Sequence, residues 1–219
     1  MPFLEHHFLS PEGELGIWKI DEDTAFFESK LDMQEKEQQL VVELKGHRRT
    51  EWLASRFLLH LMSGRDERAA CLKDEFGKPY LEDSFYHISM SHSREMTAVI
   101  AAPRLVGVDI QKLVGKIENI AHKFMRDEEL QSLKTESRLE HLHVYWGAKE
   151  ALYKAYGRKS LDFRTHIFVE PFDYDLSGGQ CSGRVVKDDF DKKFEIHYRR
   201  IDDFILVYAW EDIGDVRIA

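Results

Sequence analysis

The sequence has the composition of an acidic globular protein. Its 219 residues carry a formal net charge of -9, and 43% of them are hydrophobic. A chain of this length can form one large domain or two small ones with a real core, and its composition excludes an intrinsically disordered protein. The negative charge argues against broad binding of nucleic acid or anionic membranes, although a local basic pocket can still exist.

Cysteine use and the N-terminal segment indicate the compartment. Cys71 and Cys181 are far apart and form no C-x-x-C ligand pair, which favours a reducing environment. Residues 1–10 lack the pattern of a signal peptide, and no apolar run approaches the roughly 20 residues of a membrane span. We therefore expect a soluble cytoplasmic protein.

Hydrophobic periodicity predicts strands and two helices in the first half of the chain. In chain order we expect a strand at 15–20, helices at 32–44 and 50–62, an extended segment after the turn at 76–79, and strands at 86–90 and 97–102. The apolar set of the second helix is broad enough for a core helix. Pro103-Arg104 then forms a natural break in the chain.

The second half contains the longest predicted helix. We expect a strand at 106–110, helices at 117–124, 127–133 and 136–156, and strands at 167–170, 181–186, 194–200 and 205–210. The long helix should face a core through Leu139, Leu142, Trp146 and Tyr153, which recur at helical spacing. Helices combined with antiparallel-looking strands in both halves predict an α+β fold with domains at 1–103 and 104–219.

Asp109 is the first candidate for chemistry. In a strand reading VGVDIQ, Asp109 and Gln111 point to the same face. Their oxygens, with Glu150 as a third ligand, would suit Mg²⁺. The alternative is that Asp109 is an ordinary strand-end residue.

The long helix supplies further charged candidates. Glu150 and Lys154 are four positions apart and can share one face, with Lys149 about 100° round the helix. Taken alone, the pair suits a surface ion pair as well as an active site. On the same helix, His141 and His143 are two apart and do not form a zinc pair.

Several polar residues of the first half could bind phosphate. Ser91-His92-Ser93, expected just after a strand, offers hydroxyl and imidazole donors, or forms a simple polar turn. Lys78, in Gly77-Lys78-Pro79, could likewise either bind phosphate or belong to a simple turn. Arg48, Arg49 and Arg56 form a basic cluster, either a phosphate clamp or solvated surface with the stem of Arg56 along apolar neighbours.

The order of these motifs resembles one enzyme family. Phe76-Gly-Lys-Pro-Tyr-Leu, Ser91-His-Ser, Val106-Gly-Val-Asp-Ile and Trp146-Gly-Ala-Lys-Glu-Ala-Leu-Tyr-Lys follow one another, and Asp109 and Glu150 are 41 positions apart. This arrangement resembles the 4′-phosphopantetheinyl transferase superfamily, and within it the single-chain, surfactin-synthetase-activating type. The resemblance covers roughly residues 48–168, and the pairing of GVD with K-E-x-x-x-K is its specific part.

The resemblance implies two similar α+β halves related by pseudo-twofold symmetry, with the active site in the cleft between them. It also implies a magnesium-dependent transfer of 4′-phosphopantetheine from coenzyme A to a serine of an apo acyl or peptidyl carrier protein, which releases adenosine 3′,5′-bisphosphate. The carrier would serve fatty-acid, polyketide or nonribosomal peptide synthesis. We expect a monomer that binds neither nucleic acid nor membranes.

Residue roles are also implied by this resemblance. The metal ligands would be Asp109, Glu150 and Gln111, and the catalytic residues Glu150, as a possible base, and Lys154. Coenzyme A contacts are expected from the first half and from the long helix, namely Arg49, Arg56, Gly77, Lys78, Pro79, Ser91, His92, Lys149 and Lys154.

One residue departs from the family pattern. Many relatives have Glu where this chain has Gln111, and an amide can still ligate Mg²⁺ or orient a bound water, with one negative charge fewer. We further expect the carrier to dock beside Phe124 and Met125, next to basic Lys123 and Arg126. Two other functions remain open: a catalytically silent module that binds the carrier or coenzyme A, and a metal-dependent phosphoesterase.

Overall fold

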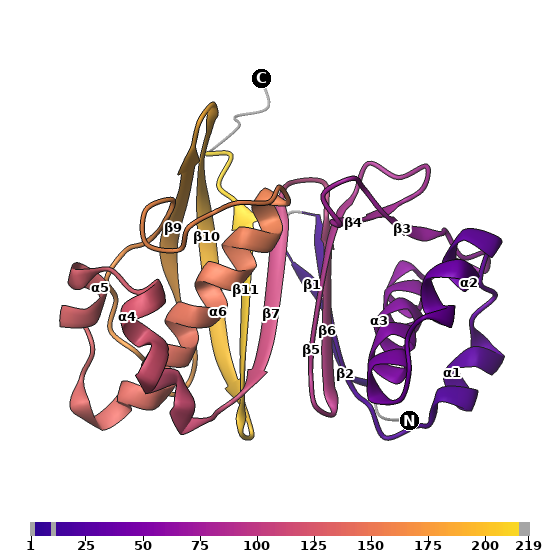
Figure 1. Cartoon of the computed structure of the whole chain (residues 1–219), viewed down its shortest axis with the longest axis horizontal. Coiled ribbons are helices and arrows are strands. Elements are labelled where there is room, and N and C mark those ends of the chain that lie inside the picture. The colour runs from indigo at the N-terminus through magenta and orange to yellow at the C-terminus, as the bar shows by residue number, and fades with distance from the viewer. Residues whose placement is uncertain (1–2, 10–11, 215–219) are drawn as a thin grey trace. The chain divides into compact units, whose positions relative to one another are not determined.

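The computed structural model describes residues 3–9 and 12–214. The chain forms two compact units, residues 1–103 and residues 104–219. Each unit combines one antiparallel sheet with helices, so the predicted α+β class is confirmed (Figure 1). Among the described residues, no helix has both the length and the apolar character needed to cross a membrane.

The first unit is built on a six-stranded sheet in the order β1-β2-β6-β5-β4-β3, with every neighbouring pair antiparallel. Its strands are β1 (Phe3–Leu9), β2 (Gly13–Lys19), β3 (Cys71–Lys73), β4 (Pro79–Leu81), β5 (His87–Ser93) and β6 (Met96–Ala102). Its helices are α1 (Thr24–Lys30), α2 (Glu35–Val42) and α3 (His47–Ser63).

Helix α3 is the core helix that its apolar set predicts. Leu53, Ala54 and Leu58 have no exposed surface, and Phe57 contacts Trp18 of β2 edge-on at 5.4 Å between ring centroids. Gly64, at φ 59°, ends the helix in the left-handed conformation that favours glycine. The unit's core therefore lies around α3, next to β2.

Some predicted elements of this unit are wrong in extent. The helix expected at 32–44 is the shorter α2, and α1, β1 and β3 were not predicted. The segment Ser91–Ser93, expected to follow a strand, is the end of β5 itself, paired with Met96–Ala98 of β6. Because hydrogen bonds to β6 supply the register, polar side chains can continue the strand beyond its apolar part.

The second unit has a five-stranded antiparallel sheet in the order β7-β11-β10-β9-β8. Its strands are β7 (Val106–Lys112), β8 (Ile167–Val169), β9 (Gly179–Lys187), β10 (Phe190–Ile201) and β11 (Phe204–Glu211). Its helices are α4 (Ala121–Phe124), α5 (Asp127–Gln131) and α6 (Arg138–Tyr156), with short 3-10 helices η1 (Gly115–Ile120) and η2 (Thr135–Ser137).

Helix α6 lies along one face of this sheet (Figure 1) and approaches it closely at two glycines. A Cβ on Gly107 of β7 would lie 1.8 Å from the carbonyl oxygen of Ala151. On the helix, a Cβ on Gly147 would lie 2.6 Å from the Val207 side chain of β11. Both positions therefore require glycine for the helix to sit where it does.

The core-facing side of α6 differs from the predicted stripe. Ala148, Ala151, Leu152 and Ala155 are fully buried, whereas Leu139, Trp146 and Tyr153 are only partly buried. Of the four predicted residues, Leu142 is the one with no exposed surface. The prediction was partly wrong because small alanine side chains let the helix approach the sheet, and the larger residues pack at its flanks.

Candidate functional site

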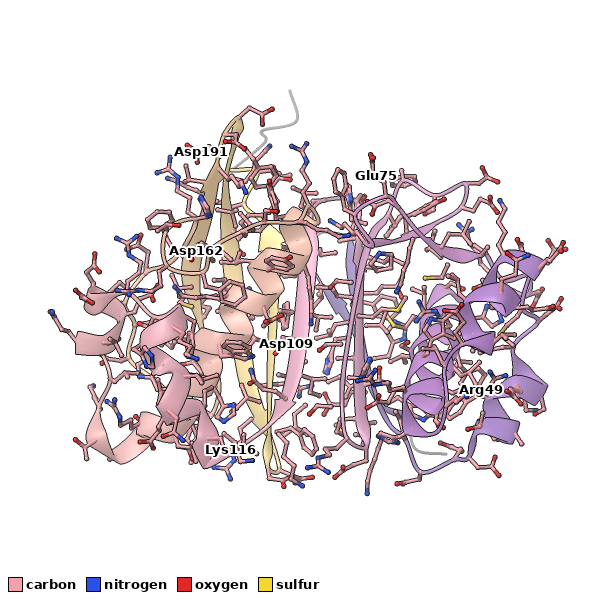
Figure 2. The ribbon with its side chains drawn as sticks, viewed as in Figure 1. Arg49, Glu75, Asp109, Lys116, Asp162 and Asp191 are labelled. Carbon is pink, nitrogen blue, oxygen red and sulfur yellow. The ribbon has the colours of Figure 1, made fainter. Side chains whose placement is uncertain are left out.

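Asp109 lies on β7, on the face that carries Gly107 and meets α6 (Figure 2). Its residue surface is 7% exposed. The ammonium group of Lys154 on α6 donates to Asp109 Oδ1 at 2.8 Å and to the carbonyl oxygen of Val108 at 2.9 Å. Lys154 of α6 and Asp109 of β7 therefore form an ion pair that joins the helix to the strand.

Glu150, one helical turn before Lys154, is partly buried beside the same aspartate. Burial raises the pKa of the Glu150 carboxyl, the negative charge of Asp109 raises it further, and Lys154 opposes both effects. The structure therefore brings Asp109, Glu150 and Lys154 together, as the spacing of the motifs predicts. Two carboxylates that repel one another in a partly buried site are suited to share a cation.

Gln111, two residues after Asp109, points its amide nitrogen into this group. Gln111 Nε2 donates to Asp109 Oδ2 at 3.2 Å and to the carbonyl oxygen of His143 at 3.0 Å. Its oxygen, Oε1, lies 2.9 Å from Nδ1 of His143. This arrangement differs from the expected ligand role, because the oxygen that would bind a metal is turned toward the imidazole.

His143 is a residue of this site that the sequence did not reveal. It is 1% exposed on α6, and its Nε2 lies 3.0 Å from the backbone nitrogen of Val114. Burial lowers the pKa of the His143 imidazole, so the ring is neutral near pH 7. Its pairing with Gln111 joins positions 32 apart in the sequence, and spacing along the helix gives no signal for that contact.

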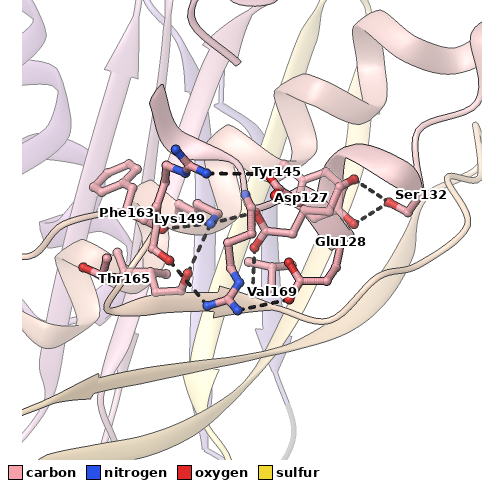
Figure 3. Close-up of polar contacts among 12 residues, drawn as sticks. Asp127, Glu128, Ser132, Tyr145, Lys149, Phe163, Thr165 and Val169 are labelled. Carbon is pink, nitrogen blue, oxygen red and sulfur yellow. Dashed lines mark hydrogen bonds and ion pairs between the residues drawn. The ribbon is translucent and has the colours of Figure 1, made fainter. Parts of the chain in front are cut away.

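The buried position of Lys149 contradicts the prediction that this side chain contacts a ligand phosphate. Its side chain is 0% exposed, and its ammonium pairs with buried Glu129 at 2.8 Å. It also donates to the carbonyl oxygens of Phe163 at 2.9 Å and Ile167 at 3.1 Å (Figure 3). With its three donors occupied inside the protein, Lys149 stabilises the second unit and has no donor left for a ligand.

The Gly77-Lys78-Pro79 segment of the first unit is a tight turn organised by Asp74. Asp74 Oδ1 accepts from the backbone nitrogens of Phe76 at 2.9 Å and Lys78 at 2.8 Å, and Gly77 has a φ of 87°. Pro79 begins β4. Burial lowers the pKa of the Lys78 ammonium to about 8, although the charge of Asp74 opposes this shift.

His92 lies at the end of β5 and pairs with Glu51 at the start of α3. His92 Nδ1 is 3.2 Å from Glu51 Oε2, and His47 Nε2 is 3.2 Å from the other oxygen of the same carboxylate. Glu51 is a second residue that the sequence did not single out. Ser91, on the same strand, is buried, and its carbonyl oxygen accepts from Thr97. The contact with a buried carboxylate fixes the orientation of the His92 imidazole.

The predicted basic cluster is divided between separate environments. Arg49 pairs with Glu28 at 2.6 Å and donates to the carbonyl oxygen of Val41 at 2.7 Å. Arg56 is 6% exposed, and its guanidinium carbon stacks on the Trp52 ring at 3.9 Å. The alternative interpretation of Arg56, a stem packed along apolar neighbours, fits these contacts.

Arg56 also lines a cavity of about 280 Å³ in the first unit. His60 and Arg65 line the same cavity, but Lys78, Ser91 and His92 are not among its described lining residues. The expected grouping of Arg56 with those phosphate-binding candidates is therefore not formed around this cavity.

The expected docking residues Phe124 and Met125 are also placed differently. They are 1% and 0% exposed, and the Phe124 ring contacts Trp146 at 5.0 Å. That part of the prediction is wrong, because these apolar side chains belong to the core of the second unit. Nearby cationic side chains on η1 and α4 are exposed instead, among them Lys116 (Figure 2) and Lys123.

Two comparisons with known proteins show what this chain is similar to. Residues 105–209 match the family model described as the 4′-phosphopantetheinyl transferase superfamily. The chain is also 30% identical over 148 residues to the 4′-phosphopantetheinyl transferase gsp of Aneurinibacillus migulanus. That match covers 64% of this chain and 62% of the relative's length. Residues 105–209 are therefore similar to the 4′-phosphopantetheinyl transferase superfamily, the family that the motifs around Asp109 and Glu150 resemble.

Proposed function

We propose that this protein transfers 4′-phosphopantetheine from coenzyme A to a serine of an apo carrier protein, with Mg²⁺ as the cofactor. The observation that carries this proposal is the convergence of Asp109, Glu150 and Lys154 where β7 meets α6. All three residues lie inside the region that matches the superfamily. A site with two coupled carboxylates and one ammonium suits the binding of a metal together with a pyrophosphate.

The donor set fits magnesium. Mg²⁺ prefers oxygen ligands and is usually held by one or two carboxylates, with waters and substrate phosphates completing its shell. Asp109 and Glu150 supply those carboxylates, and their mutual repulsion is the feature that a divalent cation would relieve. Bound there, Mg²⁺ would neutralise charge on the pyrophosphate.

The chain's own side chains account for the remaining chemistry. The carrier serine forms a bond to the phosphorus of the phosphopantetheine arm, and the bond from that phosphorus to the bisphosphate oxygen breaks. Glu150, whose pKa is raised by burial, is suited to accept the serine proton directly or through a water. Lys154 is suited to stabilise negative charge that develops on the departing bisphosphate.

Coenzyme A recognition is assigned to residues of the first unit. Lys78 offers an ammonium at the Asp74 turn, and His92 offers an imidazole oriented by Glu51. The partly exposed Arg49 can exchange its ion pair with Glu28 for a phosphate. Arg56 and Lys149 are left out of this assignment, because both are buried and packed or paired within their own units.

The carrier protein is expected to contact exposed basic side chains of η1 and α4. Carriers of this kind are acidic, and Lys116 and Lys123 are both exposed. Reversing the two charges together should raise the apparent KM for the carrier more than that for coenzyme A, because rim charges chiefly steer association. Equal KM values for wild type and the double variant would remove this surface from the proposal.

The decisive experiment uses the full chain with coenzyme A, Mg²⁺ and an apo carrier, followed by intact-mass spectrometry. The carrier should gain one phosphopantetheine group, and Glu150→Gln should abolish this gain while its unfolding midpoint stays near that of wild type. Glu136→Gln, at an exposed position before α6, is the matched control and should stay active.

The other outcomes separate the rival functions. Binding of coenzyme A or the carrier with no gain of mass would indicate a silent binding module. Release of the bisphosphate without a carrier would indicate a phosphoesterase. Near-normal transfer by Glu150→Gln would contradict the assignment of Glu150.

A further inference from the structure

We infer that His143 is a positioning residue that acts through Gln111 to fix the carboxylate of Asp109. This inference rests on the proposed function, because it concerns how the site is prepared for its metal. It assigns Gln111 a role other than direct ligation. Gln111 becomes the link between a buried imidazole on α6 and a carboxylate on β7.

The orientation of the Gln111 amide follows from its neighbours. One end of the amide faces Asp109 Oδ2 and the carbonyl oxygen of His143, and both of these atoms can only accept hydrogen bonds. An amide oxygen at that end would face two acceptors, so the NH₂ group must point there. The amide oxygen is then directed at Nδ1 of His143.

The tautomer of His143 follows in the same way. Nδ1 lies 2.9 Å from an amide oxygen, so Nδ1 carries the proton and donates it. Nε2 lies 3.0 Å from the backbone nitrogen of Val114 and 3.2 Å from its carbonyl oxygen. In the neutral ring with its proton on Nδ1, Nε2 is an acceptor and takes the hydrogen bond from the Val114 N–H. Both ring nitrogens are therefore held in place. The backbone of Val114, just before η1, holds Nε2, and the side chain of Gln111 holds Nδ1.

Packing leaves the amide little freedom to turn. A Cβ on Gly147 of α6 would lie 3.0 Å from Gln111 Nε2, so the helix backbone already lies close to the amide. On its other oxygen, Asp109 accepts from Lys154 at 2.8 Å. Both oxygens of Asp109 are thus held by side chains whose positions are set by α6. Groups that hold a metal ligand in this way typically change metal affinity by about 10- to 100-fold when they are removed.

Three substitutions at His143 separate this role from general packing. His143→Asn places an amide N–H near the position of Nδ1 and can still donate to Gln111. His143→Gln reaches toward the position of Nε2 and Val114, and His143→Leu provides neither contact. All three remove the buried ring, so their losses of thermal stability serve as the measure of the packing effect alone.

The test measures Mn²⁺ binding to each full-length variant by electron paramagnetic resonance, and the kcat and KM of transfer. We expect His143→Leu and His143→Gln to weaken Mn²⁺ binding by about 10-fold and His143→Asn to stay close to wild type. KM for coenzyme A should not change in any of the three. If the Mn²⁺ affinities follow the unfolding midpoints, or if Asn and Leu are equally weak, the inference is overturned.

Wild type distinguishes failure of this inference from failure of the proposed function. Transfer by wild type together with equal Mn²⁺ binding in all variants would reject the role of His143 and leave the function standing. Absence of both transfer and Mn²⁺ binding in wild type would reject both. Gln111→Asn, which keeps the amide but shortens it, should reproduce the effect of His143→Leu, because it cannot span the two residues.

Discussion

Gly107 of β7 and Ala151 of α6 meet so closely that a Cβ on the glycine would overlap the carbonyl oxygen of the alanine. This contact lies between the strand that carries Asp109 and the helix that carries Glu150 and Lys154. The distance from Asp109 on β7 to Glu150 and Lys154 on α6 therefore depends on Gly107, a position at which a side chain has no room.

Gly107→Ala should accordingly impair both stability and activity. The methyl group must push α6 away from β7, and overpacking of this kind costs about 1–3 kcal/mol, or more where the obstacle is backbone. We expect a lower unfolding midpoint in urea and a loss of transfer even under conditions where the protein stays folded. Gly115→Ala is the control, because a Cβ there meets no atom within 4 Å. Full activity in Gly107→Ala would show that the helix–strand distance does not matter.

Lys149 and Lys154 of α6 should respond in opposite ways to substitution by methionine. Lys149→Met leaves Glu129 buried without its ammonium partner, and breaking a buried pair in this way typically costs about 3–5 kcal/mol. Lys154, whose side chain is 26% exposed, should affect the unfolding midpoint less and reduce kcat by about 100-fold, as loss of a charge-stabilising donor does.

Chemical unfolding and steady-state transfer kinetics of the two methionine variants check this prediction. The folded fraction of Lys149→Met should keep most of its activity per molecule. If Lys149→Met instead raised the KM for coenzyme A without loss of stability, the assignment of Lys149 to the core would be wrong.

The sequence was sufficient for most of the fold, for a physical reason. Strands such as β7 and β11 and helices such as α3 have strong local periodicity, and their predicted ranges overlap the observed ones. Elements with mixed character were missed, such as β1, in which Glu5, His6 and His7 interrupt the apolar pattern. The buried face of α6 was also predicted poorly, because the alanines that face the sheet give a weak hydrophobic signal.

Motif spacing was sufficient to predict which charged side chains of β7 and α6 lie together. Asp109, Glu150 and Lys154 meet because a strand and a helix of fixed pitch present them to one another. Motif spacing could not show that Lys149 and Lys154 have different roles, because both are lysines on the same helix. Only tertiary packing buries Lys149 with Glu129. The pairing of His143 with Gln111 depends on the same packing and leaves no local trace.

Lys78 should give coenzyme A binding a dependence on pH in the alkaline range. Its pKa is lowered to about 8 by burial, so the ammonium is mostly charged at pH 7 and mostly neutral at pH 9. A hydrogen bond from a charged donor to phosphate is worth about 1.5–3 kcal/mol. We therefore expect kcat/KM for coenzyme A to fall by about tenfold between pH 7 and pH 9.

Lys78→Arg supplies the matched control for this effect. Arginine stays charged throughout that range, so the variant should keep a flat profile after correction for its own affinity at pH 7. Steady-state kinetics at saturating carrier and Mg²⁺ measure both profiles. Parallel declines in wild type and variant would assign the titration to another group.

His141 should make folding stability depend on pH in the mildly acidic range. The ring is fully buried on α6, stacked on Tyr145 at 5.0 Å, and neither of its nitrogens has a hydrogen-bond partner among the described residues. Burial lowers the pKa of the His141 imidazole to about 4. The unfolded chain therefore takes up a proton as pH falls below about 6.5, whereas the folded chain resists until about pH 4.

The free energy of unfolding should therefore decrease by about 3 kcal/mol through this residue as pH falls from 6.5 to 4. His141→Phe preserves an aromatic ring against Tyr145 and Phe172 and removes the titration. Urea unfolding at several pH values should show a shallower pH dependence for this variant than for wild type. His122→Gln, at an exposed position of α4, should keep the wild-type slope. If wild type and His141→Phe lose stability in parallel, burial of a neutral His141 does not contribute to acid unfolding.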